Sequence, residues 1–142
     1  MQRYLIAIGL LASLSLSGCR AFPYFMQGNK HCELGRYAEA IAAFDEAIRQ
    51  RPDFAEAYGN CGLVYYDLRR YEEAIAGFDE AVRLQPDDAQ AYILRGAAQF
   101  GLERHEKAVV DFEAALALAR AAGDDGLVAD IEEMLEEAVR YP

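Results

Sequence analysis

Apolar and small side chains recur along the chain three or four residues apart, from about residue 22 to residue 139. This spacing places them on one face of an α-helix, and no stretch has the strict alternation of a half-buried strand. Polar residues, glycine and proline divide the pattern into segments. The expected helices span residues 22–34, 37–50, 54–68, 71–84, 89–102, 105–122 and 125–139. The sequence therefore predicts an all-α protein.

The helical pattern is itself repeated over three units, which start at Tyr24, Tyr58 and Tyr92 and so follow one another at a constant period. Each unit has a tyrosine, a glycine, an alanine, a phenylalanine and a second alanine at matching positions. In the middle unit these are Tyr58, Gly62, Ala74, Phe78 and Ala81. We expect the small residues to lie where two helices approach closely, with the phenylalanine filling the space beneath them. A single helical hairpin cannot bury its apolar face, so stacked hairpins are predicted to share one core.

The segment from Tyr58 to Tyr65, followed by Ala74, Phe78 and Pro86, closely resembles the signature of the tetratricopeptide repeat (TPR). The resemblance implies a right-handed TPR superhelix of three helix-turn-helix repeats. The repeats would span residues 22–54, 55–88 and 89–122, with a C-terminal capping helix over residues 123–142. It also implies a scaffold that binds other proteins.

Residues 1–18 differ in kind from the rest of the chain. Arg3 precedes an apolar run from Tyr4 to Leu16, which is the layout of a secretory signal peptide and is too short to span a bilayer comfortably. The run ends in Leu16-Ser17-Gly18-Cys19, which resembles the lipobox of bacterial lipoproteins. The resemblance implies that Cys19 is acylated after cleavage before it and anchors the protein to a membrane. An ordinary signal peptide followed by a chance cysteine stays open as the alternative.

The residue after Cys19 bears on which membrane holds the anchor. In enterobacterial lipoproteins an Asp at this position favours the inner membrane, and here the position is Arg20. The resemblance therefore favours the outer membrane, with the protein facing the periplasm. Residues 19–21 would form only a short lipidated tether, so the repeats are expected to lie against the membrane. Phe22 and Phe25 are then candidates to enter the headgroup layer.

The charge and the reactive side chains narrow the classes of function. A formal net charge of −10 would repel phosphate backbones, which argues against a nucleic-acid partner. His31 and His105 occupy positions where TPR sequences often have an aromatic residue, and neither belongs to a two-histidine metal motif. The sequence has no glycine-rich phosphate loop, nucleophile elbow or CxxC motif. We therefore expect no enzyme, no metal, no cofactor and no small-molecule substrate.

Two cysteines remain beside Cys19. Cys61 takes a position where the repeat usually has a core leucine, whereas Cys32 is expected on the groove face. A disulfide requires α-carbons within about 7 Å of one another. Side chains pointing into different compartments make such a bridge the less favoured alternative to two free thiols.

In the TPR family the first helix of each repeat lines a concave groove. Carrying these positions over gives a trough of apolar and aromatic residues with a few acids. The expected groove residues are Phe22, Phe25, Asn29, Glu56, Asn60, Leu63, Tyr66, Asp67, Gln90, Ile93, Leu94, Ala97 and Phe100. Such a trough suits an amphipathic helix or an extended peptide with large apolar anchors. The alternative for several of the aromatic residues is that they only complete the core.

One specific kind of groove can be tested against the sequence. Chaperone-binding TPR domains hold a C-terminal carboxylate with two asparagines and three basic residues. Asn29 and Asn60 occupy the asparagine positions, but Phe25, Gln90 and Leu94 occupy the basic ones. A carboxylate clamp is therefore not expected. Two other roles stay open, namely self-assembly, with the groove of one copy taking the terminal helix of another, and a pilotin-like role in assembling an envelope complex.

Overall fold

Antiparallel helical hairpins follow one another along residues 19–140, which are the residues that this computed structural model describes. The helices are residues 19–33, α2 (Tyr37–Gln50), α3 (Ala55–Asp67), α4 (Tyr71–Leu84), α5 (Ala89–Gly101), α6 (His105–Ala122) and α7 (Asp125–Arg140). No strand occurs within this range. The predicted all-α class and all the expected helices are confirmed. The proposed signal peptide, residues 1–18, lies outside the described residues.

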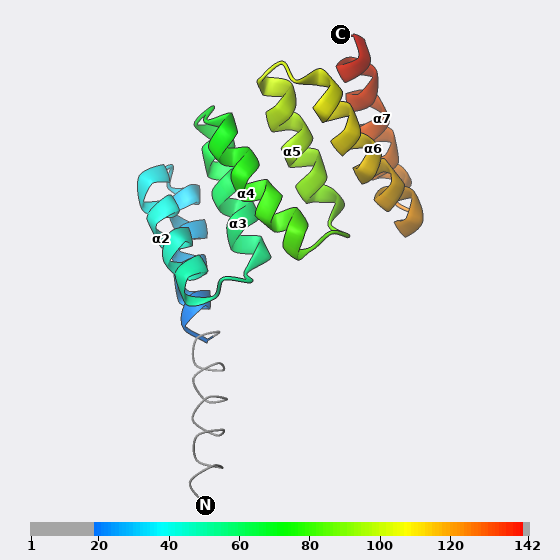
Figure 1. Ribbon diagram of the computed structural model, residues 1–142. Helices are drawn as coiled ribbons and strands as arrows, with labels where there is room; N and C mark the ends of the chain where they lie inside the picture. The colour runs from blue at the N-terminus through cyan, green and yellow to red at the C-terminus, as the bar shows by residue number, and fades with distance from the viewer. Residues whose placement is uncertain (1–18, 141–142) are drawn as a thin grey trace, which may run out of the picture.

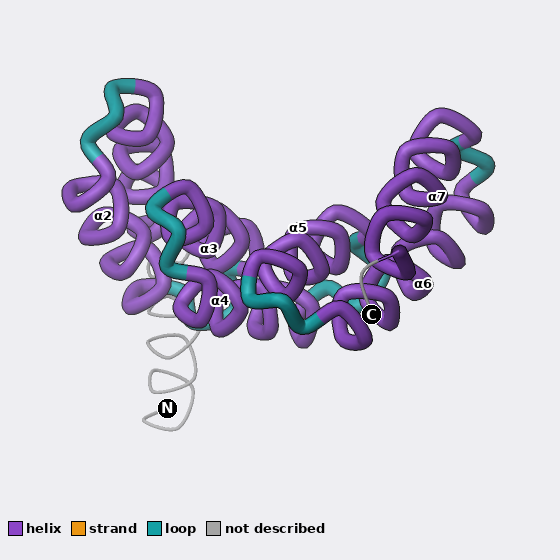
Figure 2. Tube along the Cα trace, turned by 90° about the horizontal axis from the view of Figure 1, so that it is seen from above, coloured by secondary structure: helices purple, strands orange, loops and turns teal. Residues whose placement is uncertain are grey.

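The hairpins are stacked side by side in chain order, so that the chain advances steadily from one end of the molecule to the other (Figure 1). Seen from above, the stack bends into an arc with a concave side (Figure 2). Helices α4 and α6 lie on the outer side of the arc, and α3 and α5 lie on the inner side. The fold is thus a superhelix of helical repeats, as the repeat period predicts.

Helix ends recur at the same position of each repeat. Gly35 ends the first helix with a left-handed φ of +68°, and the Arg36 N–H donates to the His31 carbonyl over 2.8 Å. A glycine at this position of the sequence predicts such a left-handed cap, and the structure confirms it. Arg69 and Glu103 occupy the equivalent position of the second and third repeats and adopt the same conformation, with φ of 57° and 58°. The turn is therefore imposed by the packing of the hairpin and does not depend on glycine.

The spacing of Asp53 before Glu56 and of Asp87 before Gln90 predicts two capping boxes, and the structure shows that this prediction is wrong. Helix α3 begins at Ala55 and its capping position is Phe54, while Asp53 pairs with Arg51 over 3.3 Å. Helix α5 is capped by Asp88, whose Oδ1 accepts from the Gln90 N–H over 3.0 Å. A capping side chain must directly precede the first helical residue to reach the N–H groups of the first turn. Asp53 and Asp87 each lie one residue too early.

The expected tether at residues 19–21 is helical instead of extended. Ala21 is fully buried and packs in a cluster with Ala47, Phe54 and Ala57. Ala21 lies one repeat period before Ala55, the residue that begins α3. The repeat unit therefore starts at residue 21, and its first helix extends back to Cys19 within the described range.

The repeated glycines and phenylalanines form the interior of each hairpin. Phe44 and Phe78 are fully buried, and Phe112 is nearly so. A Cβ placed on Gly62 would lie 2.9 Å from Phe78 Cε1 and 3.1 Å from the Ala74 carbonyl oxygen. This contact confirms that the small residue is needed where the two helices of a hairpin approach each other.

Helix α7 closes the C-terminal end of the stack. Ile131 and Ala138 are buried against α6, whereas Glu132, Glu133, Glu136 and Glu137 are exposed. The spacing of apolar residues in this segment predicts one apolar stripe with a polar opposite face, and the structure confirms both. Before it, Gly123 ends α6 in the left-handed region, and Asp124 caps α7 by accepting from the Leu127 N–H over 3.0 Å.

Candidate functional site

The concave side of the arc carries most of the expected groove residues in accessible positions. Five of them are exposed, namely Phe22, Glu56, Leu63, Asp67 and Gln90. Seven are half-buried, namely Phe25, Asn29, Asn60, Tyr66, Leu94, Ala97 and Phe100. A surface with exposed acids and half-buried rings could hold a peptide whose apolar side chains insert between its helices.

Two expected groove residues belong to the core. Ile93 is only 6% exposed and packs in one cluster with Phe112 and Ile131, so its assignment to the groove is wrong. The reason is α7, which contributes Ile131 to this cluster. Phe25 is half-buried and packs against Phe44 and Phe54, with ring centroids 6.0 and 4.8 Å apart. For Phe25 the alternative of completing the core is therefore the correct one.

A hollow of about 170 Å³ lies where α3, α5 and α7 meet. Its lining residues are Tyr66, Ala97, Phe100, Phe112, Met134 and Glu137. Ligand pockets usually measure about 300–1,000 Å³, so this hollow fits one apolar side chain better than a whole small molecule. Neighbouring rings hold Tyr66 and Phe100 in place. The Tyr66 ring packs edge-on against Tyr71, with centroids 5.4 Å apart, and the Phe100 ring packs edge-on against His105 at 4.9 Å.

The sequence interpretation missed the two residues that α7 contributes to this hollow. Tyr66, Phe100 and Met134 are separated by one repeat period each, so they occupy the same position of successive units. Helix α7 thus takes the place of the first helix of a fourth unit. Extending the repeat period by one unit would have revealed Met134.

Asn29 and Asn60 meet across the boundary between the first two repeats. The Asn60 Nδ2 donates to the Asn29 Oδ1 over 2.8 Å, and both side chains are half-buried. The structure therefore brings together the two asparagines among the expected groove residues. They add two amide groups to a surface that is otherwise mainly apolar.

A buried ion-pair network joins α4, α5 and α6, and the sequence interpretation did not foresee it. The Arg95 Nη2 donates to Asp111 Oδ1 over 2.6 Å, and its Nη1 donates to Asp79 Oδ1 over 2.7 Å. The hydrogen bonds to the nearly buried Asp111 are the main cause that raises the pKa of Arg95. The signal for this network in the sequence is that both residues depart from the repeat. Arg95 stands where the second repeat has Cys61, and Asp111 stands where the second repeat has Gly77.

Cys32 and Cys61 are free thiols that lie in one core cluster with Ala40, Phe44 and Val64. The expectation that they point into different compartments is therefore wrong. Cys61 is 6% exposed, and this burial raises its pKa from 9.0 to about 12. Burial also raises the pKa of Cys32.

The raised pKa of Cys61 predicts a loss of stability at alkaline pH. The folded state holds the thiol proton more tightly than the unfolded state, so this contribution is complete below pH 9 and declines as the pH rises from 9 towards 12. Chemical denaturation across this range should show a shallower decline for Cys61→Ala than for the wild type. Val64→Ala, which removes a neighbouring buried group that does not titrate, should keep the wild-type slope. Equal slopes for all three proteins would contradict the prediction.

The described part of the chain contains neither a metal-binding cluster nor a membrane-spanning helix. Among residues 19–140, no three His, Cys, Asp or Glu side chains are grouped to hold a metal ion. None of the helices in this range combines the length and the apolar character that crossing a membrane requires.

Comparisons with known proteins agree with this geometry. Protein-family models described as "TPR repeat" match residues 28–69 and 62–103, and one described as "Tetratricopeptide repeat" matches residues 89–121. A search of curated proteins finds no significant match to this chain.

Solved structures of TPR domains superpose on most of the chain. The TPR2B domain of yeast Sti1, in complex with pHsp70, aligns with a TM-score of 0.82 and 22% identity over 87% of this chain and 99% of its own. The first TPR of Spaghetti (RPAP3), bound to the HSP90 peptide SRMEEVD, aligns with a TM-score of 0.75 and 27% identity over 84% and 93%. Since the family models also match more than half of its residues, the chain belongs to the tetratricopeptide repeat family.

Proposed function

We propose that this chain is a non-enzymatic adaptor that binds a peptide or helix of a partner protein in its concave groove. The observation that carries the proposal is the hollow between Tyr66, Phe100 and Met134, which has room for one large apolar side chain. Buried aromatic contacts of this kind commonly provide most of the energy of an interface. The similar first TPR of Spaghetti is bound to an HSP90 peptide, which supports a peptide as the class of ligand.

The groove favours a different peptide from one held by its C-terminal carboxylate. Asn29 and Asn60 are present, but Phe25, Gln90 and Leu94 provide no cation at the three basic positions. A carboxylate there would forgo charge-assisted hydrogen bonds worth about 1.5–3 kcal/mol each. The exposed acids Glu56, Asp67 and Glu137 instead favour basic residues on either side of the apolar anchor.

The proposal also places the adaptor at the bacterial envelope, as a lipoprotein on the periplasmic side of the outer membrane. Cys19 follows an apolar run and a lipobox-like sequence, and it is exposed at the start of the first helix. Mass spectrometry of the protein purified from bacterial membranes should find acyl chains on Cys19. Cys19→Ser should move the protein out of the membrane fraction, and an unmodified Cys19 would contradict the anchor.

Crosslinking in cells tests the groove directly. A photoreactive amino acid at the exposed Leu63 should capture a partner, whereas the same probe at Val110 on the outer side should not. Adding Tyr66→Ala and Phe100→Ala should abolish the adduct, because losing one such anchor weakens binding by about 2 kcal/mol or more, roughly 30-fold. Circular dichroism should show that the double variant stays helical. Equal capture at both probe sites, or capture undiminished by the two substitutions, would exclude the groove.

The two alternative roles receive less support. Exchange of the terminal helix between copies would require α7 to leave α6, where Ile131 and Ala138 are already buried. For a pilotin-like role, no contact of the described residues points to a particular envelope complex.

A further inference from the structure

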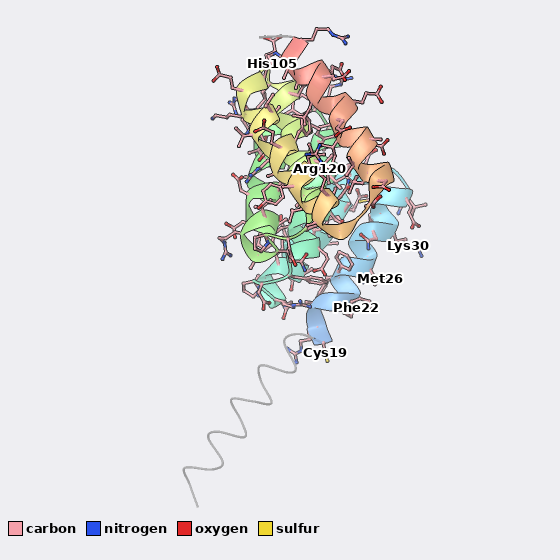
Figure 3. The ribbon with its side chains drawn as sticks, turned by 90° about the vertical axis from the view of Figure 1, so that its right-hand side faces the viewer. Cys19, Phe22, Met26, Lys30, His105 and Arg120 are labelled. Atoms are coloured by element: carbon pink, nitrogen blue, oxygen red, sulfur yellow. The ribbon has the colours of Figure 1, made fainter. Side chains whose placement is uncertain are left out.

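The first helix exposes an apolar stripe at the N-terminal end of the stack. Phe22 is 56% exposed and Met26 is 50% exposed. At about 3.6 residues per turn, Cys19, Phe22, Met26 and Lys30 fall within about 80° of one another around the helix. Figure 3 shows these four residues following one another along this helix.

Comparison with the later repeats shows that this stripe is unusual. Phe22 corresponds to Glu56 and Gln90, which are both polar and exposed. An end repeat that met only water would be expected to keep a polar residue at this position, since terminal repeats usually carry a polar outer face. The aromatic side chain is therefore a departure that water does not explain.

Lys30, two helical turns after Phe22, differs from the later repeats in the opposite sense, because it is charged where they are apolar. Lys30 corresponds to Val64 and Ala98, which are 2% and 0% exposed because a preceding hairpin covers them. Lys30 is exposed among the described residues, and its charge suits a solvated or anionic surrounding. The stripe thus carries apolar side chains near Cys19 and a cation at its far end, so Phe22 and Met26 can enter the apolar boundary of a bilayer while the Lys30 ammonium reaches the headgroups.

The distribution of charge also distinguishes the first helix from the rest of the protein. Residues 19–36 contain Arg20, Lys30 and Arg36 against one acid, Glu33. Residues 37–142 contain ten Lys or Arg and 23 Asp or Glu, a formal net charge of −13. An anionic surface would attract the first helix and repel the remainder of the protein.

We propose that the stripe of Cys19, Phe22, Met26 and Lys30 lies on the surface of an anionic lipid bilayer, with the first helix parallel to the membrane plane. The proposal rests on the lipid anchor at Cys19 proposed above and adds a defined orientation to it. Cys19 and Lys30 are about 16 Å apart along the helix, so the membrane holds the array along one edge and not at a single point. Phe25, packed on Phe44 and Phe54, takes no part.

The stripe begins at the residue that would carry the lipid, and this continuity favours the bilayer over a second copy of the chain as its occupant. Acyl chains on Cys19 would bring Phe22, one helical turn away, to the depth of the headgroups. Contact between two copies through the same stripe would offer Arg20 and Lys30 only one acid from the facing first helix, Glu33, as a counter-charge.

Tryptophan fluorescence can test the orientation, because the chain has no tryptophan of its own. Full-length, acylated Phe22→Trp and Met26→Trp would be reconstituted into phosphatidylcholine vesicles with phosphatidylglycerol and with brominated acyl chains. We expect emission at shorter wavelength and quenching of most of the intensity for both. The matched control is Val139→Trp, an apolar residue 65% exposed at the opposite end, which should be neither shifted nor quenched.

Each result decides the proposal. Quenching confined to the two stripe positions supports it, whereas no quenching there, or equal quenching at Val139→Trp, overturns it. A blue shift that grows with protein concentration and ignores brominated lipid would assign the stripe to a second copy, and would also overturn it. Vesicle flotation with mass spectrometry of Cys19 separates the two proposals, because an acylated protein that floats without stripe quenching retains its anchor but not this orientation.

Discussion

Phe78→Ala is expected to lower the free energy of unfolding by about 3–5 kcal/mol, the usual cost of removing a fully buried phenylalanine. Phe78 belongs to the middle hairpin, which contacts a neighbour on each side. Because stability in such arrays comes largely from contacts between neighbouring repeats, the cost should reach the whole stack. Urea denaturation followed by circular dichroism measures it. Val110→Ala removes a 64% exposed side chain and should have almost no effect.

A double-mutant cycle identifies the contact responsible. Gly62→Ala alone should be destabilising, since its Cβ would lie 2.9 Å from the ring of Phe78. In the Phe78→Ala background that ring is gone, so the same substitution should cost less. Strictly additive effects, or a Phe78→Ala cost no larger than that of Val110→Ala, would show that the hairpin is not packed as described.

Asp111→Ala is expected to destabilise the protein by about 3–5 kcal/mol, because it leaves the mostly buried Arg95 without its main partner. Alanine itself fits this position, since Ala43 occupies the equivalent place in the first repeat. The matched control is Asp79→Ala. Asp79 also binds Arg95, but its side chain is 55% exposed, so the loss should stay within about 1 kcal/mol.

A variant that lacks both charges distinguishes the cost of leaving Arg95 unpaired from the cost of removing side-chain volume. Arg95→Leu combined with Asp111→Ala removes the unpaired cation and should recover most of the stability lost by Asp111→Ala alone. Thermal and urea denaturation of these variants measures this. Equal costs for Asp111→Ala and Asp79→Ala, or no recovery in the double variant, would contradict the role assigned to the network.

The repeat period explains why the fold was predictable. The glycine and the phenylalanine of the repeat contact each other in every unit, so a correct prediction of one hairpin also describes the others. The period predicted α2, α4 and α6 with their observed bounds. It did not predict the hydrogen bond between Asn29 and Asn60, because the two residues are 31 apart in the chain and so occupy different positions of the repeat.

The errors fall where a unit departs from the repeat or where the following unit covers a position. Ile93 is covered by α7, which stands in the place of the next unit's first helix, and Phe25 at the equivalent position of the first unit is likewise covered by Phe54. Arg95 and Asp111 each depart from the repeat, and only the three-dimensional neighbourhood shows that the two departures compensate each other. The helix caps depend on a shift of one residue, which lies below the precision of a periodic pattern.

Helix α7 also bears on how many repeats such a protein can contain. It forms with α6 a shallow surface lined in part by the apolar Val109, Leu135 and Val139. A further helix packed on this surface would pair with α7 as another hairpin of the array. The array is therefore extensible at this end, and units can be added there by insertion or duplication without redesigning those that precede them.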